Sequence, residues 1–281
     1  MRWETGRRSS NVEDRRGMRV GGPVGVGGIG TLVLVLIVSF LTGQNPLQLL
    51  QLVGGGGPAS VDREAGSNPA DPASEFMKVV LADTEDTWTR LFAQSGDQYQ
   101  PPTLVLFEQA VESACGSASS AVGPFYCPGD RKVYLDLGFF RELEQRFGAP
   151  GDFAQAYVVA HEVGHHLQTL LGVSGRISRM QQGVSEREAN ALSVRQELQA
   201  DCFAGVWGHH AGSAVQLQEG DVDEGLRAAA AIGDDRLQRR GGGQVSPESF
   251  THGTSEQRVQ WLRQGLTSGQ IESCDTFGTS R

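Results

Sequence analysis

The stretch VVAHEVGHHLQTLLG, Val158 to Gly172, decides how the rest of the sequence is interpreted. Its apolar residues recur at helical spacing, yet three histidines and a glutamate stand in the middle. His161, Glu162 and His165 form the pattern His-Glu-x-x-His. Residues four apart lie on one helix face, so both imidazoles point the same way. They can supply two of the three protein ligands of a catalytic zinc ion.

Glu162 lies about 100° around the helix from its neighbour and can reach a water on such an ion without being a ligand. His166 lies off the ligand face, and we interpret it as a bystander. The opposite face carries an apolar stripe formed by Phe153, Ala156, Tyr157, Ala160, Gly164, Leu167 and Leu171. The pattern therefore predicts a core helix with a metal site on its other face.

A third ligand has to come from elsewhere. The metzincin extension of the motif requires Gly at 168 and His at 171, but the chain has Gln168 and Leu171. A second capped helix offers RQELQADCFAG, Arg195 to Gly205, in which Glu197 and Asp201 are four apart. Glu197 is the predicted third ligand. Asp201, one turn on, is predicted to accept a hydrogen bond from the far nitrogen of a ligand histidine.

The competing interpretation of these two carboxylates is a solvated acidic helix face. Against it, Asp201 stands in the apolar run ADCFAGVW, where an unpaired charge is costly. Other candidates for the third ligand are His209, His210 and Cys127. The two histidines adjoin a helix end, and Cys127 is better explained by a bond to Cys115.

HEVGH followed by ELQADCFAG resembles the HExxH…ExxAD arrangement of gluzincin metallopeptidases. The stretches CGSASSAVGPFYCP, VYLDLGFF, AAAIGDDRLQ and THGTSEQRVQW resemble the bacterial membrane-anchored family of neutral zinc metallopeptidases. The resemblance runs from Phe76 to the C-terminus and includes an N-terminal anchor. It implies an α+β, zincin-like fold, mainly helical with a small mixed sheet, and a zinc cofactor.

The resemblance assigns a role to each matching residue. It implies zinc ligation by His161, His165 and Glu197, a general base at Glu162 and support of a ligand by Asp201. THGTSEQR also resembles the H-P-…-R segment of some gluzincins, which places a histidine that assists the transition state at His252. Gly253 replaces the usual proline there, and the alternative is a loop histidine that caps the helix at Ser255. Because zincins bind substrate along a sheet edge, KVYLD is the candidate edge strand.

The net charge of the chain and the pattern of its N-terminal residues predict which partners it binds and where in the cell the domain lies. The formal net charge is −9, with +3 in residues 1–19 and so −12 in the remainder, which argues against nucleic acid. Residues 20–61 carry no charge, and residues 20–42 are predicted to form a single transmembrane helix. Arginines before it place the basic segment 1–19 in the cytoplasm and the domain on the extracytoplasmic side of the cell membrane. A cleaved signal peptide or a buried core helix are the alternatives.

Residues 43–74 are Gly- and Pro-rich and predict a flexible linker, so residues 75–281 form the predicted domain. Four cysteines fit two disulfides outside the cytosol, whereas in the cytosol they would be free thiols. The predicted pairs are Cys115–Cys127 and Cys202–Cys274.

Within the domain the patterns predict helices and two strands. The strands are 103–107 and 132–136, joined by a small-residue loop. The helices cover 74–96, 136–147, 152–172, 185–208, 219–233 and 255–266, with Asp152 and the box of Ser185 and Glu188 as N-terminal caps. Residues 173–184 and 234–250 are predicted as loops.

Together these features predict a membrane-anchored zinc metallopeptidase that hydrolyses peptide or protein substrates with a zinc-activated water and Glu162 as base. One alternative is a membrane-tethered binding or scaffold module that keeps zinc as a structural part. The other is a zinc hydrolase acting on a non-protein substrate such as cell-wall peptide. A retained Glu162 argues against the first, since a structural site needs no base.

Overall fold

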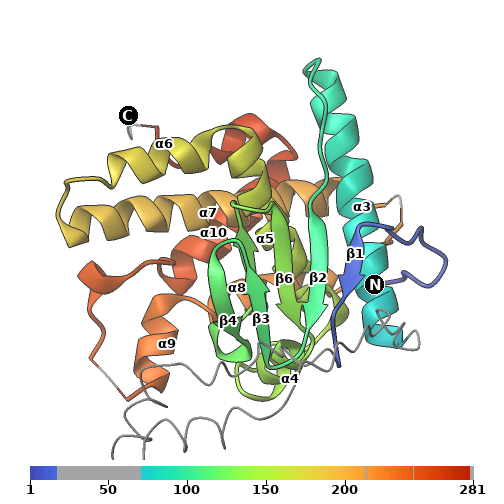
Figure 1. Ribbon diagram of the computed structural model, residues 1–281, viewed down its shortest axis with the longest axis horizontal. Coiled ribbons are helices and arrows are strands. Elements are labelled where there is room, and N and C mark those ends of the chain that lie inside the picture. The colour runs from blue at the N-terminus through green and yellow to red at the C-terminus, as the bar shows by residue number, and fades with distance from the viewer. Residues whose placement is uncertain (18–70, 213, 243, 279–281) are drawn as a thin grey trace, which may run out of the picture. The chain divides into compact units, whose positions relative to one another are not determined.

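The computed structural model describes residues 1–17, 71–212, 214–242 and 244–278, and their fold is α+β, mainly helical with a small mixed sheet (Figure 1). The sheet has the order β1-β2-β6-β5, with bounds Val12–Asp14, Thr103–Phe107, Lys132–Asp136 and Phe125–Cys127. Strands β1, β2 and β6 are parallel, and β5 is antiparallel to β6. The predicted α+β class, mainly helical with a small mixed sheet, is confirmed.

The interior of the sheet corrects one prediction. KVYLD forms β6, which pairs with both β2 and β5 and is therefore an inner strand. The prediction that KVYLD is the edge strand is wrong, because the predicted loop before it supplies a strand of its own, β5. The same segment also folds into a two-stranded hairpin of β3 (Ala110–Ser113) and β4 (Gly116–Ser119).

Each of the six predicted helices has a counterpart among the described residues, with somewhat different ends, and two further helices are present. They are α3 (Pro72–Gln94), α4 (Gly138–Gln145), α5 (Asp152–Leu170), α6 (Val173–Met180), α7 (Glu186–His210), α8 (Asp221–Ala231), α9 (Asp234–Arg240) and α10 (Ser255–Ser268). The loops predicted at 173–184 and 234–250 contain α6 and α9. The capping box of Ser185 and Glu188 is present at the start of α7.

The start of α5 is capped from another helix. Asp152 was predicted to be the cap, but the N-cap position is Gly151 and no side chain of α5 itself caps the helix. Instead Glu224 of α8 accepts a hydrogen bond from the backbone N–H of Phe153, at 3.1 Å. Gly151 has φ 120°, and a Cβ there would lie 2.1 Å from the Glu224 carboxyl carbon. A glycine therefore lets the carboxylate reach the helix end.

Helix α5 lies between the sheet and α7, in contact with both. Its predicted apolar stripe is buried except at Leu171, which follows the helix and is 47% exposed. Gly164 makes the closest approach, since a Cβ there would lie 2.9 Å from the carbonyl oxygen of Ala200. This contact brings α5 against α7 on the side of the ligands, and Tyr157 lines the same cavity as they do, so the stripe does not lie wholly opposite the metal site as predicted.

Helix α10 packs against the other side of α7 at paired glycines. A Cβ on Gly265 would lie 2.0 Å from the Cys202 carbonyl oxygen, and one on Gly205 would lie 2.2 Å from the Leu262 carbonyl oxygen. The disulfide Cys202–Cys274 joins α7 to the chain after α10. The other disulfide is Cys115–Cys127, so both predicted pairs are confirmed.

We expect Gly265→Ala to lower the free energy of unfolding by at least roughly 1–3 kcal/mol, because the backbone atoms it meets cannot yield as a side chain can. The control is Gly175→Ala on exposed α6, whose new Cβ would meet only the end of Arg179, at 3.6 Å. That change should be neutral or stabilise by up to about 1 kcal/mol. Denaturant unfolding of both variants checks this, and equal effects would contradict the close helix packing.

The N-terminal residues correct the predicted domain boundaries. Met1–Arg16 and Asn68–Arg281 form one compact unit, so a basic segment separate from a domain that starts at residue 75 is wrong. The reason is that residues 12–14 add a strand to the sheet beside β2. Across the described residues no helix is both long and apolar enough to cross a bilayer. The predicted span 20–42 and most of the predicted linker 43–74 lie outside the described residues.

Candidate metal centre

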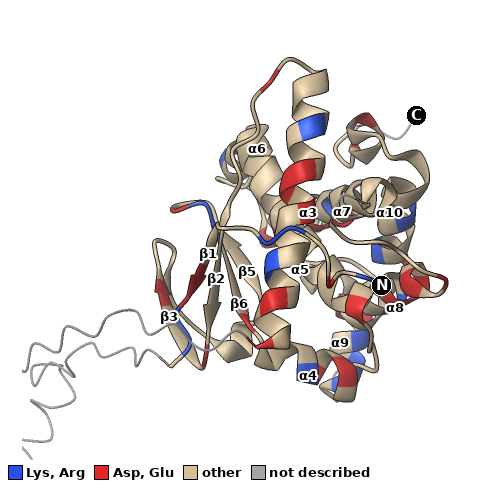
Figure 2. Cartoon of the chain, turned by 90° about the vertical axis from the view of Figure 1, so that its right-hand side faces the viewer, with Lys and Arg blue, Asp and Glu red and all other residues tan. Residues whose placement is uncertain are grey.

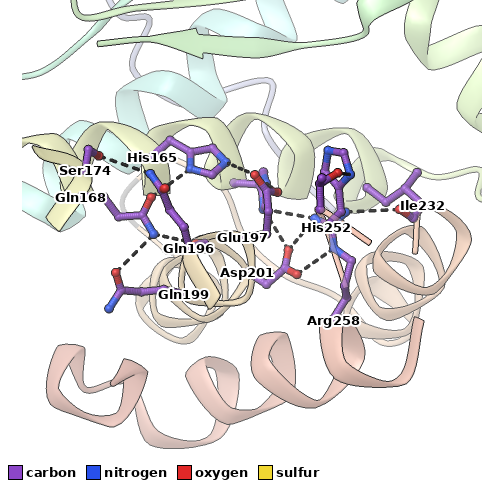
Figure 3. A network of polar contacts seen from close by, with 12 residues as sticks. His165, Gln168, Ser174, Gln196, Glu197, Gln199, Asp201, Ile232, His252 and Arg258 are labelled. Carbon is purple, nitrogen blue, oxygen red and sulfur yellow. Dashed lines mark hydrogen bonds and ion pairs between the residues drawn. The ribbon is translucent and has the colours of Figure 1, made fainter. Parts of the chain in front are cut away.

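Two helices bring the three predicted ligands together. His161 and His165 extend from α5 and Glu197 from α7, and one ligand atom of each lies within 4.8 Å of the others. The Glu197 carboxylate oxygens are 3.2 Å from His161 Nε2 and 3.3 Å from His165 Nε2. Figure 3 shows the His165 and Glu197 side chains pointing toward each other across the gap between the helices. Two imidazoles and a carboxylate are the protein ligand set of many catalytic zinc sites.

The far nitrogens of both histidines are held by acceptors. His161 Nδ1 lies 2.8 Å from Asp201 Oδ1, as predicted for this carboxylate. His165 Nδ1 lies 2.9 Å from Gln168 Oε1, a contact that the sequence analysis did not foresee. Such partners fix the ring orientation and leave Nε2 for a metal ion. The donor set therefore fits zinc.

Gln168 is itself fixed. It is fully buried, and its amide nitrogen donates to the Gln196 carbonyl oxygen at 2.7 Å and to Gln199 Oε1 at 3.2 Å. These contacts settle which end of the amide faces His165. From the sequence, Gln168 served only to exclude the metzincin motif, which requires glycine there. Its position one turn after His165 is what lets it contact that histidine.

Asp201 is held from a third helix. It is fully buried, and Arg258 of α10 donates to its two oxygens from Nε at 2.8 Å and from a terminal nitrogen at 2.9 Å. The Tyr157 hydroxyl donates to Asp201 Oδ1 at 2.5 Å. Figure 3 shows Arg258 and Asp201 in contact below Glu197. The buried carboxylate is thus paired rather than solvated, which excludes the acidic-face interpretation.

The charges of this network shift the pKa values of its members. Burial lowers the pKa of His161, but Asp201 and Glu197 more than offset this and raise it to about 10. Burial raises the pKa of Asp201, but Arg258 and His161 more than offset this and lower it to about 2. Asp201 therefore stays ionised, and a metal ion that binds His161 has to displace its proton.

Glu162 shares a cavity with the ligands but is not among them. The cavity has a volume of about 730 Å³, and His161, Glu162, His165 and Glu197 all line it. Burial raises the pKa of Glu162, which the two neighbouring imidazoles partly offset. A carboxyl whose pKa lies above its usual range is suited to accept and release a proton near neutral pH.

The comparisons with known proteins show the family of the chain. The family described as "Putative neutral zinc metallopeptidase" matches residues 1–277. The chain belongs to this family. It is 47% identical to "Uncharacterized protein YpfJ" of Escherichia coli K12 over 291 residues, which cover 100% of both chains. It is 42% identical to "Uncharacterized protein Rv2575" of Mycobacterium tuberculosis H37Rv over 219 residues, or 74% of this chain and 73% of that one. No solved structure matches this metallopeptidase-family chain.

His252 lies at the wall of the same cavity. Its Nδ1 is 3.1 Å from Asp234 Oδ1, and Asp234 Oδ2 accepts from the backbone N–H groups of Thr251, His252 and Gly253. Burial raises the pKa of Asp234, but His252 and these N–H groups more than offset this and lower it. Asp234 thus fixes the position of His252. The sequence did not indicate this role, because Asp234 looks like an ordinary acidic residue in the first turn of a helix.

The alternative role for His252 as a helix cap does not hold. The N-cap of α10 is Thr254, whose side chain accepts from the Gln257 backbone N–H. Gly253 has φ 89°, a conformation that proline cannot adopt, which accounts for the departure from the H-P pattern. Arg258, six residues on, is the arginine of that segment.

The other candidate ligands have different partners. His209 Nδ1 and His210 Nε2 lie 2.8 Å from the carbonyl oxygens of Leu266 and Gly269, near the end of α10. Cys127 is in a disulfide. His166 is fully buried between the Gln100 carbonyl oxygen and the Tyr126 hydroxyl, so it supports the fold.

If the site hydrolyses peptides and His252 donates to the oxyanion, His252→Ala should lower kcat by roughly 10²–10³-fold, the usual cost of one lost oxyanion donor, with KM little changed. Zinc content should stay at the wild-type level, because His252 is not a ligand. Steady-state kinetics with metal analysis of the same samples checks both. A variant with wild-type kcat would remove His252 from the chemistry.

Proposed function

We propose that this protein is a neutral zinc metallopeptidase that cleaves peptide bonds with Glu162 as general base. The observation that carries the proposal is the convergence of three ligand atoms within 4.8 Å on the wall of a large cavity that also holds Glu162. Structural zinc sites are closed by four protein ligands, whereas catalytic sites keep one position open. Among the described residues, this group offers three ligands.

Bound zinc would lower the pKa of a water from about 15.7 toward about 7 and polarise the scissile carbonyl. The chain's own residues then handle the proton. Glu162 takes it from the attacking water and gives it to the leaving amine, which its raised pKa supports. In this proposal His252, which Asp234 holds, donates a hydrogen bond to the oxyanion as it forms.

The sheet offers a docking edge for an extended substrate. Strand β5 pairs with β6 on one side, and no described strand pairs with its other side. Phe125 and Tyr126 of β5 line the cavity together with the metal ligands. A peptide added along β5 would receive backbone hydrogen bonds and lie beside Glu162. An edge strand antiparallel to its neighbour β6, in contact with the His-Glu-x-x-His helix α5, is consistent with the zincin-like fold.

The location we propose is extracytoplasmic. Two disulfides hold the domain together, and such bonds persist outside the reducing cytosol. Cys115–Cys127 joins β5, the proposed docking edge, to the hairpin of β3 and β4. Cys202–Cys274 joins α7, which carries the ligand Glu197, to the chain after α10.

The test is hydrolysis of an unbiased peptide library by the zinc-loaded protein, followed by mass spectrometry, with a set of cell-wall peptides in parallel. We expect new termini in the library that vanish after chelation and return with zinc. Cleavage of cell-wall peptides alone would replace the peptidase proposal by a hydrolase with a non-protein substrate. No cleavage of either set, with zinc bound, would favour a zinc-containing scaffold module.

A further inference from the structure

The first sixteen residues are built into the domain as a structural part. Strand β1 adds to the sheet in parallel with β2, with Val12 opposite Leu104 and Asp14 opposite Leu106. Arg2 and Gln216 form a second, antiparallel bridge with reciprocal backbone hydrogen bonds of 3.0 and 2.8 Å. Figure 2 shows this segment crossing α3 on its way to β1.

A buried carboxylate on α3 depends on the segment for its partners. Glu85 is 7% exposed and accepts hydrogen bonds from Ser9 Oγ at 2.5 Å, Asn11 Nδ2 at 2.7 Å and Arg7 at 2.8 Å. All three donors come from residues 7–11. Without them the carboxylate would be buried and unpaired, which proteins avoid. The sequence of α3 is therefore adapted to a docked N-terminus.

The start of α3 lies beside the N-terminal segment of residues 1–16. An Arg16 terminal nitrogen lies 2.6 Å from Asp71 Oδ2, and Asp71 is the N-cap of α3. A second pair, Arg8 with Glu75 at 3.3 Å, joins the same two parts of the chain. A bilayer has a hydrocarbon core about 30 Å thick. It cannot separate residues that form a direct ion pair.

We propose that residues 1–16 and residues 71–278 lie on the same side of any membrane that the chain contacts. The orientation predicted from the sequence, with a cytoplasmic N-terminus and the domain outside, would pull β1 from the sheet and leave Glu85 without its donors. The residues between Arg16 and Asp71 thus start and finish on one side. This inference is independent of the proposed peptidase activity.

The test is a cross-link in intact cells that express the full chain. Hydrogen-bonded antiparallel residues have Cα atoms about 5.5 Å apart, within the range of a disulfide. Arg2 and Gln216 are such a pair and both are exposed. The double variant Arg2→Cys/Gln216→Cys, treated with a membrane-permeant oxidant and then alkylated, should carry a disulfide within one chain in most molecules. Peptide mass spectrometry identifies it.

The matched control is Asp97→Cys/Gln216→Cys. Asp83 of α3 accepts a hydrogen bond from the Ala214 backbone N–H, so this part of α3 lies near residue 216. Asp97 follows the C-terminal end of α3, which is about 16 Å from Asp83 at 1.5 Å per residue. It should not cross-link. A second measurement compares Ser10→Cys with Asp97→Cys, both exposed, under a membrane-impermeant maleimide. Equal labelling or equal protection supports the proposal. Labelling of one position alone, or no cross-link of residues 2 and 216 in cells, overturns it.

Discussion

Replacing Glu162 by glutamine is expected to lower peptide hydrolysis by roughly 10²–10⁴-fold, the usual loss for a general base. The fold and the bound zinc should be retained, because Glu162 lines the cavity without belonging to the ligand group. Glutamine has the same shape but cannot accept the proton. The measurement is kcat/KM on a cleaved library peptide, with zinc content and melting temperature from the same preparation.

The control for this change is Glu186→Gln, which alters an exposed glutamate in the first turn of α7. It should hydrolyse at the wild-type rate. If Glu162→Gln did so too, with zinc bound, Glu162 would not be the base and the proposed mechanism would be wrong.

Replacing Glu197 by alanine is expected to abolish zinc retention on dialysis, since it removes one of three ligands and leaves two imidazoles. Replacing Gln168 by methionine should have a smaller effect, because all ligands remain and only the orientation of His165 is freed. We expect zinc affinity to fall roughly 10–100-fold there, the usual cost of losing such a partner. Competition against a chelator measures both.

Asp201→Asn belongs to the same series, because it keeps an oxygen near Arg258 while changing the partner of His161. It should also weaken zinc binding by roughly 10–100-fold. Alanine at this position would leave the Arg258 charge buried and unpaired, so a loss of fold would obscure the effect on zinc. His209→Ala is the control, and loss of zinc there with retention in Glu197→Ala would refute the ligand assignment.

The sequence predicted the site where chemistry is encoded locally. The spacing of His161, Glu162 and His165 on one helix, and of Glu197 and Asp201 on another, follows from helical periodicity alone. The cap at Ser185 was equally local. What periodicity could not show is which helices meet, because the contact of Gly164 with Ala200 is set by tertiary packing.

The missed residues are those whose partners are distant in the chain. Arg258 reaches Asp201 across 57 residues, and Asp234 reaches His252 across 18. Each looks like an ordinary polar residue of a helix until the helices are packed. Gln168 is closer, at three residues from His165, but an amide in a helix carries no distinctive signal.

The strands that were missed are short and rich in small residues. The hairpin reads AVES and GSAS, in which Val111 is the only β-branched residue and none is aromatic, and it forms because its two halves pair with each other. Strand β1 is three residues long among arginines and acids, so its composition indicated only a separate basic segment. The segment that leads into it is held by Glu85, which lies 74 residues from Asn11 and 78 from Arg7.

The most direct test of a zinc-dependent, Glu162-driven peptidase is a titration of the metal-free protein with zinc while hydrolysis of one library peptide is followed. The account predicts that the rate rises in proportion to added zinc and levels off at one zinc per chain, while Glu162→Gln binds the same zinc and stays nearly inactive. A rate that does not depend on zinc, or an equally active Glu162→Gln, would contradict it.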